Sequence, residues 1–219
     1  MSSSGYFIFV CHHTSANLCP VGYDTRGESM TSATPTKRKI TAEQFWRFCA
    51  DGKPRELVRG EVLEKIPVGT WHAITASLIS HRLRLFLDSL SERIGVVAVE
   101  LGIILRYADE ESVRAPDIAF IRKEKLPHPL PEGYAEFVPD LVVEIVSPND
   151  TYTEVRDKVD ELLLAGVQVV WVVDPQRRKV EVYQQDSPMQ TLQEGDTLTC
   201  EAILPRFTLP VSEIFAELP

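Results

Sequence analysis

Two acidic residues lie in apolar surroundings where a charged side chain is costly. Asp117 follows Pro116 at the head of a hydrophobic stretch, and Glu144 lies inside the apolar run 141–146. An ionised carboxylate that is buried needs a partner: a cationic side chain, backbone donors or a divalent cation. Magnesium is typically held by one or two carboxylates, a carbonyl and waters, which leaves room for phosphate oxygens. A structural ion pair explains either residue alone equally well, but two carboxylates on consecutive strands favour a metal site.

The segments that carry these carboxylates are expected to be strands next to a helix. Residues 115–121 and 140–146 both predict strands, and the second is almost wholly apolar, as in a strand buried on both faces. A capping box of Thr151 and Glu154 opens a helix that follows. An apolar strand at 167–173 completes the unit, which forms a right-handed crossover if its strands are parallel.

The rest of the chain adds helices and strands around this unit. A capping box of Thr41 and Gln44 opens the first helix, and Gly95 ends a long amphipathic one. In chain order the pattern predicts a helix at 42–50, two short strands hinged at Gly60 within 57–64, a helix at 71–94, strands at 96–99 and 103–107, a loop at 122–138, a strand at 179–184, and then short strands with a final helical turn. The fold class is therefore α/β (α+β), with a mixed central sheet flanked by helices.

The composition is that of a globular protein with an atypical N-terminal segment. Residues 1–36 are rich in Ser, Thr, Gly and Pro, which predicts a disordered leader before one domain at 37–219. One hypothesis places the natural start of translation at Met30. The formal net charge of −9 argues mildly against nucleic-acid binding by charge alone, although a metal can still serve a phosphate ligand. No apolar run approaches the ~18 residues of a membrane span, so we expect no membrane partner and a cytoplasmic location.

Several motifs together resemble the Uma2 family of restriction endonucleases, within the PD-(D/E)xK nuclease superfamily. The resemblance covers roughly residues 40–215 and rests on Leu57 to Glu64, His72, Pro116 to Ala119, Pro139 to Pro148, Lys158, Gly166 with Val167, and Val170 to Pro175. It implies a restriction-endonuclease-like core and a hydrolase that cleaves phosphodiester bonds of nucleic acid, DNA more than RNA, with Mg²⁺ (or Mn²⁺). Dimers are frequent in the superfamily, which implies a homodimer.

The resemblance also implies roles for individual residues. Asp117 and Glu144 match the acidic positions of the motif and, with the Ile145 carbonyl, would hold the metal. Superfamily members often add a carboxylate from the first long helix or just before it, so Glu61 could complete the metal shell. His72, at the start of that helix, could contact a phosphate or carry a proton. The simpler interpretation of Glu61 is a solvent-exposed glutamate in a hairpin, and that of His72 is a histidine at a helix cap.

One motif position departs from the family pattern. The lysine that orients the attacking water would stand at position 146, where this chain has Val146. Lys158 on the following helix is the expected replacement, since a lysine moved to that helix is a known variation of the superfamily. The alternative for Lys158 is a solvated helix charge that pairs with Glu161 three residues later.

Two other classes of function compete with a nuclease. A catalytically degenerate module that binds nucleic acid or protein fits both Val146 and the acidic charge, and it gains if the Lys158 ammonium points away from the carboxylates. An antitoxin-like or scaffold protein would act as a dimer through an exposed apolar face, and a large hydrophobic patch far from the carboxylates would favour it.

Overall fold

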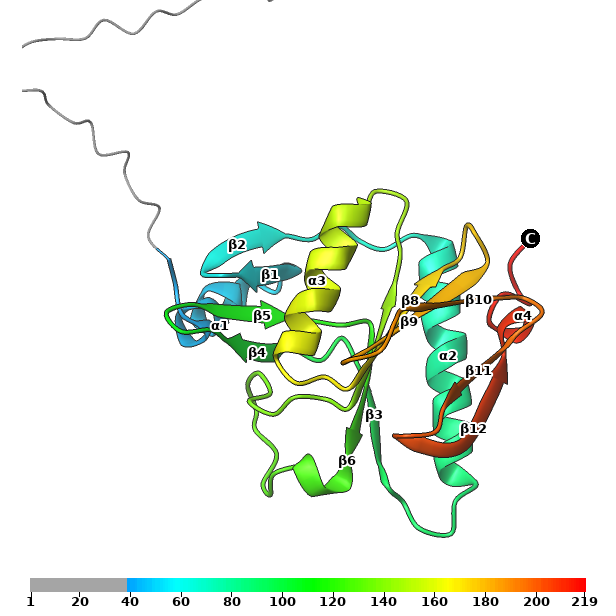
Figure 1. Ribbon diagram of the computed structural model, residues 1–219. Coiled ribbons are helices and arrows are strands. Elements are labelled where there is room, and N and C mark those ends of the chain that lie inside the picture. Colours follow the sequence, from blue (N-terminus) through cyan, green and yellow to red (C-terminus); the bar gives the residue numbers. More distant parts are fainter. Residues whose placement is uncertain (1–38) are drawn as a thin grey trace, which may run out of the picture. The chain divides into compact units, whose positions relative to one another are not determined.

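The computed structural model describes residues 39–219, and a six-stranded mixed sheet lies at their centre (Figure 1). The strand order is β10-β9-β8-β7-β6-β3. These strands are β3 (Gly95–Val99), β6 (Ile118–Arg122), β7 (Leu141–Ile145), β8 (Val169–Asp174), β9 (Lys179–Gln184) and β10 (Gln190–Gln193). Within this sheet β7 and β8 run parallel, and every other neighbouring pair is antiparallel. Every residue of β7 and β8 is buried, which accounts for their continuous apolar sequence.

Two helices cover the two faces of the central sheet. The long helix α2 (Thr70–Asp88) packs on one face, and α3 (Tyr152–Leu164) connects β7 to β8 and packs on the other. Because side chains alternate along a strand, Val143 of β7 joins the core under α2 while Val142 joins the core under α3. Glu144 has the same parity as Val142. Its side chain therefore belongs to the face that α3 covers.

A second, four-stranded sheet has the order β2-β1-β5-β4 and is antiparallel throughout. Its strands are β1 (Arg55–Val58), β2 (Glu61–Glu64), β4 (Ile103–Arg106) and β5 (Glu111–Arg114). The helix α1 (Ala42–Phe48) packs on this sheet through Ala42 and Phe45, followed by the short turn η1 (Cys49–Asp51). Ile103 and Leu105 of β4 belong to the same core as α3, so this helix lies between the two sheets.

The C-terminal segment completes the core on the α2 side. It consists of the antiparallel pair β11 (Thr197–Cys200) and β12 (Leu204–Pro210), followed by α4 (Val211–Ile214). Phe207 of β12 contacts Phe86 of α2 edge-on and stacks with Trp171 of β8. Trp171 is fully buried among these groups, so it is a core residue.

Most expected elements are present, including both capping boxes and the parallel β7–β8 pair. The long helix ends at Asp88 rather than at residue 94, because Leu90 and Ile94 pack against the core from a turn and so imitate helical spacing. The sequence pattern does not predict β5, because most residues of this short strand are polar. The strand expected at 115–121 begins at Ile118, after a short link from β5.

The remaining element, η2 (Lys123–Lys125), interrupts the loop expected at 122–138. The expected leader at 1–36 and the hypothesis about Met30 lie outside the described residues. In the part of the chain that is described, no helix is both long and apolar enough to cross a membrane.

Candidate active site

Asp117 and Glu144 meet at one end of the central sheet. Asp117 immediately precedes β6, and β6 is antiparallel to β7 with Ile118 opposite Val143. Continuing this register by one residue places Asp117, just before β6, opposite Glu144 of β7. The Ile145 backbone N–H donates a hydrogen bond of 2.6 Å to Asp117 Oδ2, which fixes the aspartate against β7.

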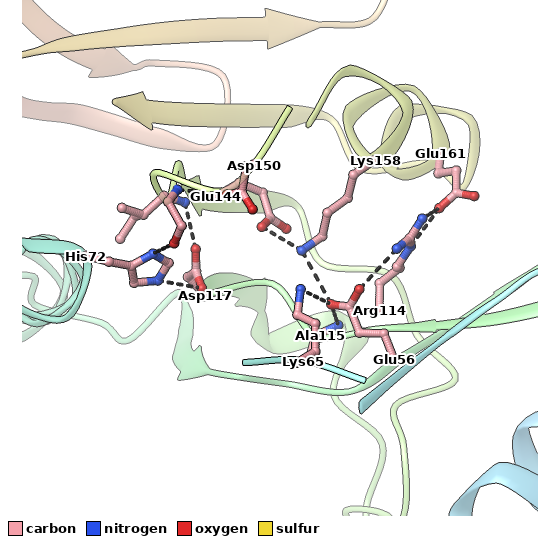
Figure 2. Close-up of polar contacts among 12 residues, drawn as sticks. Glu56, Lys65, His72, Arg114, Ala115, Asp117, Glu144, Asp150, Lys158 and Glu161 are labelled. Carbon is pink, nitrogen blue, oxygen red and sulfur yellow. Dashed lines mark hydrogen bonds and ion pairs between the residues drawn. The ribbon is translucent and has the colours of Figure 1, made fainter. Parts of the chain in front are cut away.

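Lys158 reaches Glu144 from α3. Its Nζ lies 2.7 Å from Glu144 Oε2, and Figure 2 shows the ammonium between Glu144 and Glu56. Burial opposes the charged form, but the carboxylates of Glu144, Glu56 and Asp117 raise the pKa of Lys158 well above its ordinary value. Lys158 is therefore a buried cation that faces the carboxylates. The alternative of a solvated charge paired with Glu161 is wrong for this structure, because Glu161 pairs with Arg114 instead.

Glu144 combines deep burial with one unsatisfied oxygen. The residue is 8% exposed, and its Oε1 is buried without a hydrogen-bond partner among the described groups. Burial raises the pKa of Glu144 to about 7; Lys158 opposes this rise, and the nearby charge of Asp117 adds to it. Buried polar atoms are nearly always hydrogen-bonded or ligated. This oxygen is therefore suited to bind a cation.

His72 binds Asp117 and lies close to the start of α2. Its Nε2 is 3.0 Å from Asp117 Oδ1, and its Nδ1 is 3.1 Å from Ser147 Oγ. The histidine is 8% exposed, so it is a buried residue that contacts Asp117 and not a helix-cap residue at the surface. Its position orients the aspartate. Ser147 was not singled out from the sequence, because a serine in a turn carries no distinguishing signal.

The structure brings Glu56 to Lys158 and leaves Glu61 on the surface. Glu56 on β1 places Oε1 3.5 Å from Lys158 Nζ and is 3% exposed. Glu61 is an exposed residue of the neighbouring strand β2. A role for Glu61 in a metal shell stays a prediction. Glu56 could have been noticed as an acidic residue directly before the apolar pair Leu57 and Val58, but that signal is weak.

A buried ion-pair network continues from Glu56 away from the carboxylate pair. Arg114 on β5 places NH1 3.0 Å from Glu56 Oε2 and NH2 2.6 Å from Glu161 Oε2. Burial opposes ionisation of Glu56, yet Lys158, Lys65 and Arg114 lower its pKa to about 2. Opposite charges thus alternate from Glu144 to Glu161, as Figure 2 shows.

A surface pocket opens beside Asp117. It has a volume of about 490 Å³ and lies along α2 and the end of β3. His72 and Asp117 belong to its lining, together with Val68, Ala73, Ala76, Ser77, Ser80, His81, Arg84, Val99 and Glu100. Small side chains on α2 keep the pocket open, and His81 and Arg84 can donate hydrogen bonds to an anionic ligand.

The carboxylate pair satisfies only part of what a metal ion requires. Among residues 39–219, no cluster of three or more His, Cys, Asp and Glu side chains is arranged to hold a metal ion. Magnesium needs fewer protein ligands, because one or two carboxylates suffice when waters and substrate phosphates complete its shell. Asp117 and the unpartnered oxygen of Glu144 fit that requirement. Ile145 contributes its N–H to Asp117, and a role for its carbonyl stays a prediction.

Comparison with known proteins gives a family match and a solved structure with a similar fold. The sequence pattern of the Uma2 family, described as "Putative restriction endonuclease", matches residues 42–212. A similar solved structure is that of "a putative nuclease belonging to DUF820 from Anabaena variabilis ATCC 29413". It has a TM-score of 0.67 and 21% sequence identity, and the match covers 81% of this chain and 98% of that chain. No curated protein matches the sequence.

Proposed function

Because the chain belongs to the Uma2 family, we propose that it is a metal-dependent endonuclease that hydrolyses phosphodiester bonds, with DNA as its preferred substrate. The family description and the similar structure both suggest a nuclease. The observation that carries the proposal is the approach of Lys158 Nζ to 2.7 Å from Glu144 Oε2, with Asp117 held beside the same strand by the Ile145 N–H. The degenerate-module alternative would have gained support from a Lys158 ammonium that points away from the carboxylates, and the ammonium faces Glu144 instead.

In the proposed mechanism, Asp117 and Glu144 would hold Mg²⁺ (or Mn²⁺) together with the Ile145 carbonyl. When bound, such a cation polarises the scissile phosphate and lowers the pKa of a water. His72 keeps the Asp117 carboxylate oriented through its hydrogen bond. The Lys158 ammonium positions the attacking water and stabilises the negative charge that develops on the phosphate.

The substrate would reach these groups along the pocket beside α2. Asp117 lies in the lining of this pocket, so a phosphate seated there would be next to one of the proposed metal ligands. His81 and Arg84 would contact the sugar-phosphate backbone, which positions a nucleic acid without reading its sequence. The net charge of −9 predicts weak non-specific binding that depends on the metal. A homodimer, which the frequent dimers of the superfamily imply, is a further proposal, and light scattering of the purified protein tests it. A cytoplasmic location also stays a proposal.

A cleavage assay tests the function. The purified chain is incubated with double-stranded DNA, single-stranded DNA and RNA, in Mg²⁺ or in excess chelator. We expect internal cleavage of DNA in Mg²⁺ only, and none by Asp117→Asn, which keeps the size of the side chain but removes its charge. Asp88→Asn is the matched control, because Asp88 is an exposed carboxylate at the end of α2. Equal cleavage by Asp117→Asn and the wild type would contradict the proposal.

A further inference from the structure

Glu56 connects the second sheet to the proposed active site, and we infer that it is a positioning residue for Lys158. The inference rests on the proposed nuclease function for the role of the lysine. Glu56 Oε1 is 3.5 Å from Lys158 Nζ and accepts a hydrogen bond of 3.3 Å from Ala115 N. Ala115 stands two residues before Asp117. One carboxylate therefore holds both the lysine and the backbone that leads to the aspartate.

Lys158 needs an anchor besides Glu144. A lysine ammonium is a point charge on a flexible four-carbon stem, so a single ion pair does not fix its position. Glu144 is also a proposed metal ligand, and a divalent cation competes with the lysine for the negative charge of that carboxylate. Glu56 lies on the far side of the ammonium from Glu144 (Figure 2). Its charge stays available to Lys158 when Glu144 binds the metal.

Glu56 is itself held firmly in place. Arg114 NH1 is 3.0 Å from Glu56 Oε2, and Lys65 Nζ is 3.5 Å from Oε1. Arg114 is fixed in turn by Glu161, which accepts from both Nε at 2.7 Å and NH2 at 2.6 Å. The glutamate is 3% exposed. Its carboxylate is therefore a rigid, ionised group between β5 and α3 rather than a mobile surface charge.

The rival account is that Glu56 only neutralises Arg114 and stabilises the fold. The two accounts differ in what happens to Lys158, because loss of fold stability alone leaves the lysine bound to Glu144. Asp140 provides the matched control for a structural role. It is a fully buried carboxylate at the opposite end of β7, and it contacts Lys125 and Gln168 at 3.0 Å.

The test compares Glu56→Gln, Glu56→Asp and Asp140→Asn in the full chain. The first measurement is the NMR signal and order parameter of the Lys158 ammonium, assigned with Lys158→Arg. The second is kcat for DNA cleavage at saturating metal, together with KM. We expect Glu56→Gln to weaken the ammonium signal through mobility and exchange, and to lower kcat about 10–100-fold with little change in KM. Glu56→Asp should recover part of kcat, and Asp140→Asn should leave the Lys158 signal and the kcat of the folded fraction unchanged.

The results of this test either overturn the positioning role of Glu56 or separate it from the proposed function. An unchanged ammonium signal in Glu56→Gln overturns it, whether or not kcat falls, as does an equal loss of the signal in Asp140→Asn. If Glu56→Gln fails to fold, Glu56→Asp takes its place, and a fully ordered ammonium with wild-type kcat in that variant overturns the inference. If the wild type cleaves no nucleic acid while Glu56→Gln still mobilises Lys158, the positioning role of Glu56 stands and the proposed function falls.

Discussion

The Lys158 ammonium contacts Glu144 Oε2 at 2.7 Å, from a helix rather than from the strand that carries the glutamate. The contact is possible because Glu144 faces α3, as Val142 does. Position 146 lies on the same face but holds a valine packed against the α3 core. Lys158 on α3 therefore contacts the glutamate of the acidic pair, whereas the family pattern expects that lysine on the strand at position 146.

Replacing Lys158 with methionine should lower kcat without weakening metal binding. The neutral side chain fills the same space but cannot stabilise charge on the phosphate, and the loss of one such donor costs about 10²–10³ in kcat. Removal of a cation beside Glu144 should favour a bound divalent ion. Single-turnover cleavage and Mn²⁺ titration calorimetry measure the two effects. Lys123→Met is the control, because Lys123 pairs with Glu92 on the surface; a kcat for Lys158→Met equal to that of this control contradicts the role.

Replacing His72 with alanine should reduce metal affinity about 10–100-fold, as loss of a residue that orients a metal ligand typically does. The reason is that Asp117 Oδ1 loses its hydrogen bond from the imidazole. Mn²⁺ titration of the purified variants gives the dissociation constants. His81→Ala is matched, since His81 is an exposed histidine of the same helix that lines the same pocket. Similar affinities in the two variants would rule out an orienting role.

Replacing Arg114 with methionine should destabilise the fold by about 3–5 kcal/mol, the cost of breaking a buried ion pair by removing one partner. Glu56 and Glu161 would then keep buried negative charges without their shared cation. Urea denaturation measures the free energy of unfolding. Arg93→Met is expected to change it by less than about 0.5 kcal/mol, because Arg93 and its partner Asp88 are both exposed. Equal losses of unfolding free energy in the two variants would contradict a stabilising role of the buried ion-pair network.

Stability should fall in acid partly through Glu56. Its pKa is lowered from 4.5 to about 2 in the folded state, so its contribution is complete above the unfolded pKa and is lost as the pH falls through the folded one. The shift corresponds to about 3 kcal/mol. The difference in unfolding free energy between the wild type and Glu56→Gln should be largest above pH 5 and shrink towards pH 2. Urea titrations across this range measure it, and a constant difference contradicts the ionised state of Glu56.

Local patterns in the sequence predict the acidic pair and the elements that carry it. The apolar run around Glu144 indicates a buried strand, and the capping box at Thr151 and Glu154 fixes where α3 begins. These signals lie within a few residues of the groups concerned. Together with the family resemblance, they suffice to name Asp117 and Lys158 as members of the candidate site.

Contacts between the second sheet and α3 could not be predicted in the same way. Glu56 and Lys158 are about a hundred residues apart, and their ion pair depends on how the second sheet packs on α3. Arg114 lies in a strand whose polar composition conceals it. Glu161 has an equally plausible local partner in Lys158, and only the tertiary arrangement selects Arg114 instead.

A crystal soaked in Mn²⁺ shows whether Asp117 and Glu144 share a divalent cation, as the proposed function requires. Anomalous diffraction locates manganese independently of any enzymatic activity. We expect a manganese peak within coordination distance of Asp117 and of Glu144 Oε1, with Lys158 still beside Glu144. Manganese bound elsewhere on the protein, with no peak between these two carboxylates, would contradict it.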